Sequence, residues 1–115
     1  MKPSMFLALA VGALALIAAA MPVAADSASH EIRQFDKAFH PDTLTITAGD
    51  TVVLHNNADR THNIRVFHPK LDFNSGAQRP GEDVTIPFDS PGTYYVTCGI
   101  HTQMELKVEV RPATD

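Results

Sequence analysis

Residues Thr93 to Val110 read TYYVTCGIHTQMELKVEV. The centre of this stretch, Cys98 to Met104, places a thiol, an imidazole and a thioether within seven residues. Sulfur and imidazole donors together suit Cu, Zn or Fe, and two histidines and one cysteine with a weak, distant methionine are typical of electron-transfer copper centres. The loop supplies one histidine, His101, so a second must come from elsewhere in the chain.

The residues on both sides of this loop alternate between apolar and polar side chains. The apolar positions are Tyr94, Val96 and Cys98 before the loop, and Met104, Leu106, Val108 and Val110 after it. This period of two predicts a strand on each side, with both sulfur atoms pointing toward one interior. The alternative is that Cys98 and Met104 are ordinary core residues and His101 is a solvated turn residue, since Cys and Met are common in cores.

The first 25 residues have the composition of a secretory signal. Lys2 precedes an apolar run from Met5 to Ala20, and small residues then lead to Ala25, ahead of Asp26. This order of charged, apolar and small residues is that of a cleaved leader. We expect residues 1–25 to be a signal peptide and residues 26–115 to be exported to the periplasm or beyond the cell. An uncleaved membrane anchor is disfavoured because the run is shorter than the roughly 20 residues of a spanning helix.

Length and charge exclude several classes of protein. The chain has 115 residues, which allow one domain, and a formal charge of −4 that becomes one unit more negative if Lys2 leaves with the leader. No basic stripe indicates nucleic acid. The single cysteine, Cys98, cannot form an internal disulfide, and its neighbours favour a metal ligand over a free thiol or a dimer link. We expect a monomer that, once cleaved, binds neither nucleic acid nor membrane.

The remainder of the chain indicates strands and no sustained helix. Expected strands cover residues 31–36, 44–48, 51–56, 63–67, 84–88, 93–98 and 104–110. In the first of these, Ile32 and Phe35 break strict alternation. Residues 69–80 contain breakers and are expected to be irregular, either wrapping an edge or holding a short helical turn. Strands at turn-bounded intervals of about 8 to 12 residues predict an all-β fold, a small antiparallel sandwich or barrel.

Six short motifs together resemble the cupredoxin family. They are Gly49-Asp50-Thr51-Val52, Asn56-Asn57, His62-Asn63-Ile64, Pro80-Gly81-Glu82, Gly92-Thr93-Tyr94 and Cys98-Gly99-Ile100-His101-Thr102-Gln103-Met104. Within the family, the segment from Asn56 to Ile64 is similar to plastocyanins, and the short Cys-x-x-His-x-x-Met loop is similar to amicyanins. The resemblance spans nearly all of residues 26–115 and implies a Greek-key β-sandwich that binds one type 1 copper.

The resemblance also implies the site residues. His62, Cys98 and His101 would be the copper ligands, and Met104 would be the axial ligand. Asn63 would be the residue whose backbone N–H bonds the cysteine sulfur and whose side chain joins the two ligand loops. Such outer partners are needed because ligands must be held in one orientation. The alternative for Asn63 is an ordinary turn residue.

Three positions depart from the family pattern without removing a ligand. Leu54 stands where an aromatic residue is frequent, Thr61 where a proline precedes the ligand, and Glu105 where a glycine commonly follows the methionine. Glu105 alternates with Leu106 and is therefore expected to face water, although a carboxylate beside the axial position could compete as a ligand. The remaining histidines, His30, His40, His55 and His68, are expected to be surface or loop residues, because their spacing forms no second metal site.

The function expected from these residues is one-electron transfer between redox partner proteins, without enzymatic activity. His101, in a surface loop, is the expected point of electron exchange. Copper sequestration or delivery is the alternative, disfavoured because every methionine except Met104 lies in the leader. A copper enzyme would need further histidine clusters or domains. A zinc or structural site stays open, and Met104 is the residue that argues against it.

Overall fold

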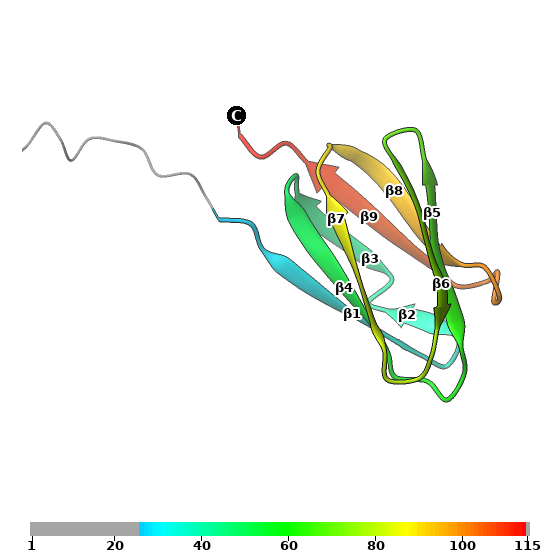
Figure 1. Cartoon of the computed structure of the whole chain (residues 1–115). Coiled ribbons are helices and arrows are strands. Elements are labelled where there is room, and N and C mark those ends of the chain that lie inside the picture. Colours follow the sequence, from blue (N-terminus) through cyan, green and yellow to red (C-terminus); the bar gives the residue numbers. More distant parts are fainter. Residues whose placement is uncertain (1–25, 115) are drawn as a thin grey trace, which may run out of the picture.

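The computed structural model describes residues 26–114, which form two facing β-sheets (Figure 1). The first sheet has the order β2-β1-β4-β7, with β1 (Ser29–Phe35), β2 (Ala38–His40), β4 (Asp50–Asn56) and β7 (Asp83–Phe88). The second has the order β3-β9-β8-β5-β6, with β3 (Thr43–Thr47), β5 (His62–His68), β6 (Leu71–Gln78), β8 (Gly92–Cys98) and β9 (Glu105–Arg111). The predicted signal peptide, residues 1–25, lies outside the described residues. Within residues 26–114, no helix has the length and apolar character to cross a membrane.

The predicted fold class, a small all-β sandwich, is confirmed. The sandwich was predicted to be antiparallel, and this is wrong for two strand pairs, because β1 pairs with β4 and β3 pairs with β9 in parallel. The other pairs are antiparallel. Parallel neighbours cannot be joined by a hairpin. The chain therefore passes to the opposite sheet between β1 and β4, and again between β3 and β9, so both sheets are mixed.

The core lies between the two sheets and follows the alternation of the strands. Its buried apolar side chains come from both sheets: Ile32, Phe39, Ile46, Val52, Leu54, Ile64, Val66, Ile86, Phe88, Tyr94, Val96, Cys98, Met104, Leu106, Val108 and Val110. Burying one Val, Leu, Ile, Phe or Met side chain contributes about 1.5–3 kcal/mol. The inward face predicted for residues 94–98 and 104–110 is confirmed, since each of its positions is at most 4% exposed.

The segment expected to be irregular contains a strand instead. Strand β6 (Leu71–Gln78) pairs antiparallel with β5 at the edge of the larger sheet. Its half-buried positions, including Leu71 and Phe73, alternate with exposed polar residues. The apolar signal stops after Phe73, and Gly76 adopts a positive φ of 71° where the register of the pair shifts. An edge strand with so few apolar residues resembles a loop when it is judged from composition alone.

The first strand also differs from its prediction. Ile32 and Gln34 are the inward residues of β1, both 0% exposed, whereas Phe35 is 38% exposed and stacks on the ring of His40 at 3.8 Å between centroids. The alternation is therefore strict. The sequence suggested a break because the aromatic residue, rather than the glutamine, was assumed to face the core.

The four histidines expected at the surface are half-buried and have partners. His55 lies between Asp83 and Glu31, with each of its ring nitrogens 2.6 Å from a carboxylate oxygen. The bonds to Asp83, and then to Glu31, raise the pKa of His55 above its ordinary value. This arrangement links β1, β4 and β7 across the outer face of the smaller sheet. The ring of His68 packs on Tyr94, with centroids 4.1 Å apart.

The carboxylate of Asp50, at the start of β4, accepts three hydrogen bonds. The donors are the backbone N–H of Ala28 at 2.9 Å, Nε2 of His30 at 2.9 Å and the backbone N–H of Thr47 at 3.1 Å. The bond from Ala28, followed by those from His30 and Thr47, lowers the pKa of Asp50 to about 2. The hydrogen bonds of Asp50 thus connect the residues that precede β1 with the turn between β3 and β4.

We predict that Asp50→Asn is less stable than the native chain at neutral pH and that the difference shrinks on acidification. The folded pKa lies below the ordinary value of 3.8, so the carboxylate stabilises the fold above pH 3.8 and this contribution is lost as the pH falls toward about 2. Urea unfolding at several pH values measures the difference. Asp72→Asn, an exposed change on β6, is the control. A difference for Asp50→Asn that stayed constant down to pH 2 would contradict the prediction.

Candidate metal centre

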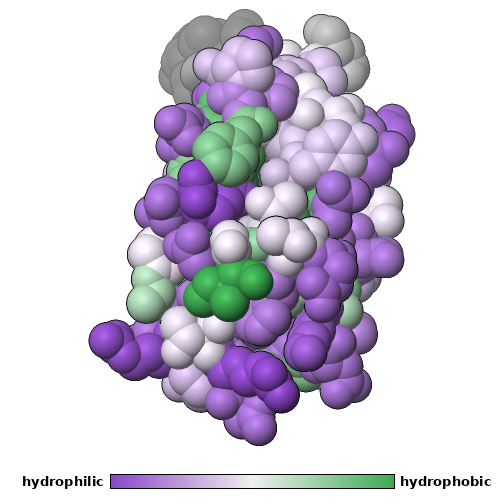
Figure 2. Space-filling view, turned by 90° about the vertical axis from the view of Figure 1, so that its right-hand side faces the viewer, coloured by the Kyte–Doolittle hydropathy of each residue, from purple (hydrophilic) through white to green (hydrophobic). Residues whose placement is uncertain are grey.

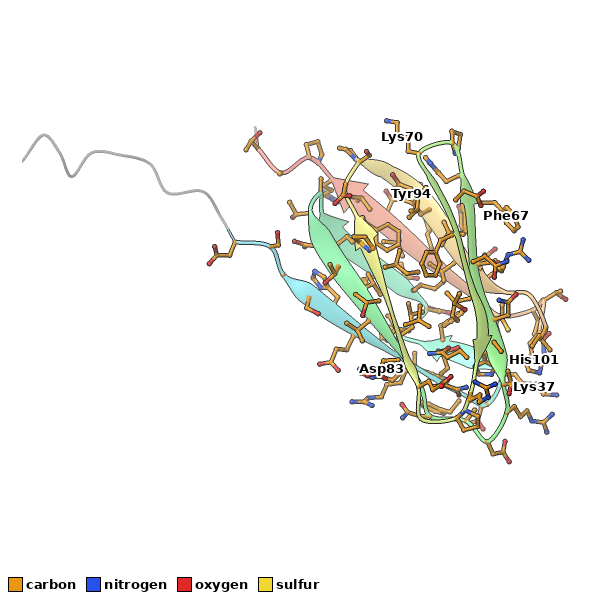
Figure 3. All side chains as sticks on the ribbon, viewed as in Figure 1. Lys37, Phe67, Lys70, Asp83, Tyr94 and His101 are labelled. Atoms are coloured by element: carbon orange, nitrogen blue, oxygen red, sulfur yellow. The ribbon has the colours of Figure 1, made fainter. Side chains whose placement is uncertain are left out.

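The loop between β8 and β9 joins two inward-facing sulfur residues. Cys98 ends β8 and Met104 immediately precedes β9, and each is 1% exposed. The loop closes on itself, because the backbone N–H of Met104 donates to the carbonyl of His101 at 3.0 Å. Figure 3 shows His101 at the same end of the sandwich as Lys37 and away from Lys70 and Tyr94. The candidate ligands of this loop therefore lie at one end of the molecule.

The sulfur of Cys98 has three nitrogen atoms around it. The backbone nitrogens of Asn63 and His101 are each 3.5 Å from Sγ, and Nδ1 of His101 is 3.8 Å from it. Both backbone N–H groups donate toward the sulfur. Such donors stabilise a thiolate, which is the form of cysteine that binds metals. The geometry thus places two backbone N–H donors around a buried sulfur.

His62 enters the same region from the start of β5. The loop before it is shaped by the buried side chain of Asn56, whose Nδ2 donates to the carbonyls of Arg60 and Gln78 at 2.8 and 3.1 Å. The His62 side chain is fully buried, and its ring lies perpendicular to that of His101, with centroids 5.3 Å apart. Burial, and secondly the charge of His101, lower the pKa of His62 below its ordinary value. The ring is therefore neutral at neutral pH and offers a lone pair.

One nitrogen of His62 has no protein partner. Nδ1 lies 2.7 Å from Oε1 of Gln34, whereas Nε2 is buried and makes no hydrogen bond within residues 26–114. An unsatisfied buried polar atom costs about 1–3 kcal/mol. The Cys98 thiol and the imidazoles of His62 and His101 are donors of the kinds that suit copper.

Asn63 joins the two ligand segments through its backbone. Its N–H points at the Cys98 sulfur, as the resemblance implied, and its carbonyl accepts a hydrogen bond from the N–H of Gly99 at 2.8 Å. Its side chain, however, donates to Asn74 Oδ1 at 2.8 Å and to the Gly76 carbonyl at 2.9 Å. These two bonds tie β5 to the edge strand β6, so the side chain does not join the ligand loops.

The predicted site residues differ in how the structure places them. Contacts within the structure join His101 to Cys98 and His101 to His62. Met104 reaches the same end through its loop and its burial, and Glu105 is exposed, as its alternation predicted. Sequence reasoning missed Gln34 and its partner Gln78. The signal was present in β1, because Gln34 follows Ile32 at a spacing of two and so belongs to the inward face.

The sequence matches a family model described as "Cupredoxin-like domain" over residues 6–110. The chain belongs to the cupredoxin family. Membership agrees with the two mixed sheets and with the sulfur and imidazole donors gathered at one end of them.

Three curated relatives from different organisms are similar to this cupredoxin. A pseudoazurin of Rhizobium leguminosarum bv. viciae is 34% identical over 84% of this chain and 66% of its own length. The methylamine utilization protein MauL of Methylophilus methylotrophus is 32% identical over 74% of this chain and 51% of its own length. A plastocyanin of Scenedesmus fuscus is 33% identical over 60% of this chain and 80% of its own length. The chain thus spans between half and two thirds of the first two relatives.

Solved structures of other cupredoxins have the same fold. A reduced amicyanin variant superposes with a TM-score of 0.67 at 22% identity, over 72% of this chain and 82% of that one. The copper-containing nitrite reductase NirK of Thermus scotoductus SA-01 superposes with a TM-score of 0.66 at 26% identity, over 79% of this chain and 25% of that one. This cupredoxin therefore corresponds in extent to most of the amicyanin chain and to a quarter of the nitrite reductase.

We predict that Gly99→Ala destabilises the protein through a clash with Asn63. A Cβ at Gly99 would lie 2.5 Å from Asn63 Oδ1, and the Asn63 side chain is held by its two bonds to β6. Forcing such a shift costs about 1–3 kcal/mol. Denaturant unfolding of Gly99→Ala, Asn63→Ala and the double variant forms a cycle. Gly99→Ala should cost less in the Asn63→Ala background, and strictly additive changes would show that the clash is relieved elsewhere.

Proposed function

We propose that this cupredoxin is a small blue copper protein that carries single electrons between redox partner proteins. The observation that carries the proposal is the Cys98 sulfur, which receives two backbone N–H donors beside two imidazole rings, one of them with an orphaned buried nitrogen. A bound copper would supply a Cu(II)/Cu(I) couple, which is one-electron chemistry.

The proposed ligands are His62, Cys98 and His101, with Met104 as the axial ligand. Each is anchored by regular structure or by a closed turn, since His62 starts β5, Cys98 ends β8 and Met104 leads into β9. A donor set with little freedom to rearrange suits electron transfer, because the same arrangement must serve both charge states of the metal. The hydrogen bonds to the sulfur then tune the reduction potential.

The proposed route for electrons is His101, which is half-buried in the loop. Gly99 and Ile100 beside it are exposed, Ile100 to 55%. Figure 2 views the side of the molecule that carries this loop and shows isolated hydrophobic side chains on a largely hydrophilic surface. A small apolar contact ringed by polar groups fits a short-lived encounter with a redox partner, because such contacts bury little area.

We also propose that the protein acts after export, most simply in the periplasm, with residues 1–25 removed as a signal peptide. The support is the charged, apolar and small-residue order of the leader. Intact mass of the protein isolated from its native cells tests this, because a mature chain that begins at Asp26 is expected.

Copper delivery is the competing function, and the donor set disfavours it. Met104 is the one methionine after residue 25, and it is buried. A delivery protein must hand its metal to a partner, for which exposed thioethers are the suitable soft donors.

We predict that the purified protein binds one copper per chain and has an intense thiolate-to-copper absorption that disappears on reduction. Cys98→Ser should abolish this colour, because the transition needs sulfur. Voltammetry should show rapid, reversible one-electron exchange in the native protein. Thr97→Ser, a change beside the ligand that leaves the sulfur in place, is the control. A protein that stays colourless when loaded with Cu(II), or that loses copper when reduced, would argue for a zinc site or for delivery.

The axial role of Met104 can be tested with two substitutions of similar volume. Met104→Leu removes a soft donor and leaves an apolar group that disfavours the more highly charged Cu(II), so the potential should rise. Met104→Gln offers a harder oxygen donor that stabilises Cu(II), so the potential should fall. Met104→Leu should remain folded, because a volume-conserving apolar change typically costs less than about 1.5 kcal/mol. Met104→Gln buries an amide and should be less stable, so its circular dichroism is compared with that of the native protein before the potential is measured. Unchanged potentials in both would mean that Met104 is only a core residue.

A further inference from the structure

A histidine on the outer face of the smaller sheet is held between two carboxylates from different strands. His55 lies near the end of β4, with its Nε2 2.6 Å from Oε1 of Glu31 on β1 and its Nδ1 2.6 Å from Oδ1 of Asp83 on β7. The side chain of His55 is 20% exposed, whereas those of Glu31 and Asp83 are 62% and 55% exposed. The imidazole is thus mostly covered, while both carboxylates remain in contact with water.

The two contacts determine how many protons the ring carries. An ionised carboxylate only accepts hydrogen bonds, and a neutral imidazole has one donor nitrogen and one acceptor nitrogen. A neutral ring can therefore bond only one of the two carboxylates, and its lone pair would face an oxygen of the other. Both contacts are hydrogen bonds when the ring carries two protons, which makes His55 an imidazolium between two negative charges.

The charged groups that face His55 come from both neighbouring strands. Asp83 on β7 and Arg33 on β1 lie directly opposite His55 in the register of the sheet, and Glu31 is the second charged residue of β1. The guanidinium of Arg33 donates to Oδ1 of Asn57 at 3.2 Å. Two negative charges thus act on the ring against one positive charge, and the balance favours the charged form of the imidazole.

We propose that Glu31, His55 and Asp83 form a pH-sensitive clasp, which connects β1, β4 and β7 only while the ring carries two protons. When one proton is lost, the deprotonated nitrogen presents a lone pair to a carboxylate oxygen. That carboxylate must then turn into the water to which it is already exposed. One neighbouring strand thereby loses its side-chain connection to β4, so the end of the smaller sheet is held less tightly above the midpoint of this proton loss than below it.

The clasp lies at the end of the sandwich that also carries the candidate metal centre. Figure 3 shows Asp83 and His101 at this end. Directly after His55, the backbone N–H of Asn56 donates to the carbonyl of Glu82 at 3.1 Å, and the Asn56 side chain shapes the loop between β4 and β5. Opening of the clasp is therefore expected to loosen the end of β4 and this loop before the rest of the sheet.

The titration of the His55 ring, followed by NMR in the native protein, provides the first test. Its midpoint should lie above the ordinary pKa of 6.5, because the bond to Asp83 and then the bond to Glu31 favour the charged ring. Glu31→Gln and Asp83→Asn should each lower the midpoint, and Asp72→Asn on the other sheet is the control. A native midpoint at or below 6.5, or one that neither substitution lowers, would overturn the proposal.

Urea unfolding at several pH values provides the second test. Because the folded pKa of His55 is raised, the clasp stabilises the fold fully below pH 6.5, and this contribution is lost as the pH rises through the folded pKa. The difference in stability between the native chain and His55→Gln should therefore shrink as the pH rises. His40→Gln is the matched control, since His40 lies near the same face but its Nε2 faces the carbonyl of Phe35. A difference that stayed constant or grew with pH would contradict the clasp.

Amide hydrogen exchange tests where the sheet loosens. The protection of the Asn56 N–H, relative to an unstructured chain, should fall in the native protein as the pH rises through the His55 midpoint. In His55→Gln it should be low and nearly independent of pH, and native protection that is equally pH-independent would rule out a conformational role. If His55→Gln does not fold, the titrations of Glu31→Gln and Asp83→Asn decide the question. None of these measurements monitors copper, so the result is independent of the proposed function.

Discussion

The register between β8 and its two neighbours is the constraint on which the rest of the site depends. Val96 lies opposite Leu106 on β9, and Cys98 lies opposite Ile64 on β5. Because side chains alternate with a period of two, a slip of one residue would turn the cysteine to solvent together with every apolar neighbour on its face. The burial of Val96 and Leu106 stabilises this register. Because the same register points the Cys98 sulfur inward, core packing also determines the orientation of the sulfur.

Polar groups are buried in this sandwich mainly at the two ends of β4. At the start of the strand, Asp50 accepts three hydrogen bonds and fixes the segment before β1. At its end, the side chain of Asn56 donates hydrogen bonds to two backbone carbonyls and so shapes the loop that precedes His62. Buried polar groups are stabilising only when their bonds are complete. The incomplete member of this set is His62 Nε2, which makes no hydrogen bond within residues 26–114.

Local periodicity was enough to predict the all-β class, the inward faces around the ligand loop and the exposure of Glu105. Periodicity failed where the polarity of a side chain did not match the face on which the alternation places it. Phe35 was assumed to face the core because it is aromatic, yet its place in the alternation puts it outside, and the buried glutamine one residue before it was overlooked. The edge strand β6 was missed because apolar residues end at Phe73, and an edge is stabilised by pairing with β5 more than by its own burial.

Long-range pairing explains the remaining gaps in the prediction. The parallel pairs β1–β4 and β3–β9 join segments whose intervening chain crosses to the other sheet, and no local pattern records such a crossing. The same is true of the hydrogen bonds of the Asn63 side chain, which reach Asn74 and Gly76 only because the register of β5 with β6 shifts between Asn63 and Arg65. A motif can name the residues of a site, but the partners of those residues depend on strands that the motif does not contain.

The burial of the donors also bears on the choice between carrying electrons and carrying copper. A protein that releases its metal must expose the donors one by one to a competing ligand, whereas here Cys98, His62 and Met104 are each at most 1% exposed. Only His101 lies in a loop and reaches the surface. Release of the metal past the half-buried imidazole of His101 would need local unfolding of strands whose side chains form the core. An electron would need no such opening, so the distribution of burial supports the proposed electron transfer over copper delivery.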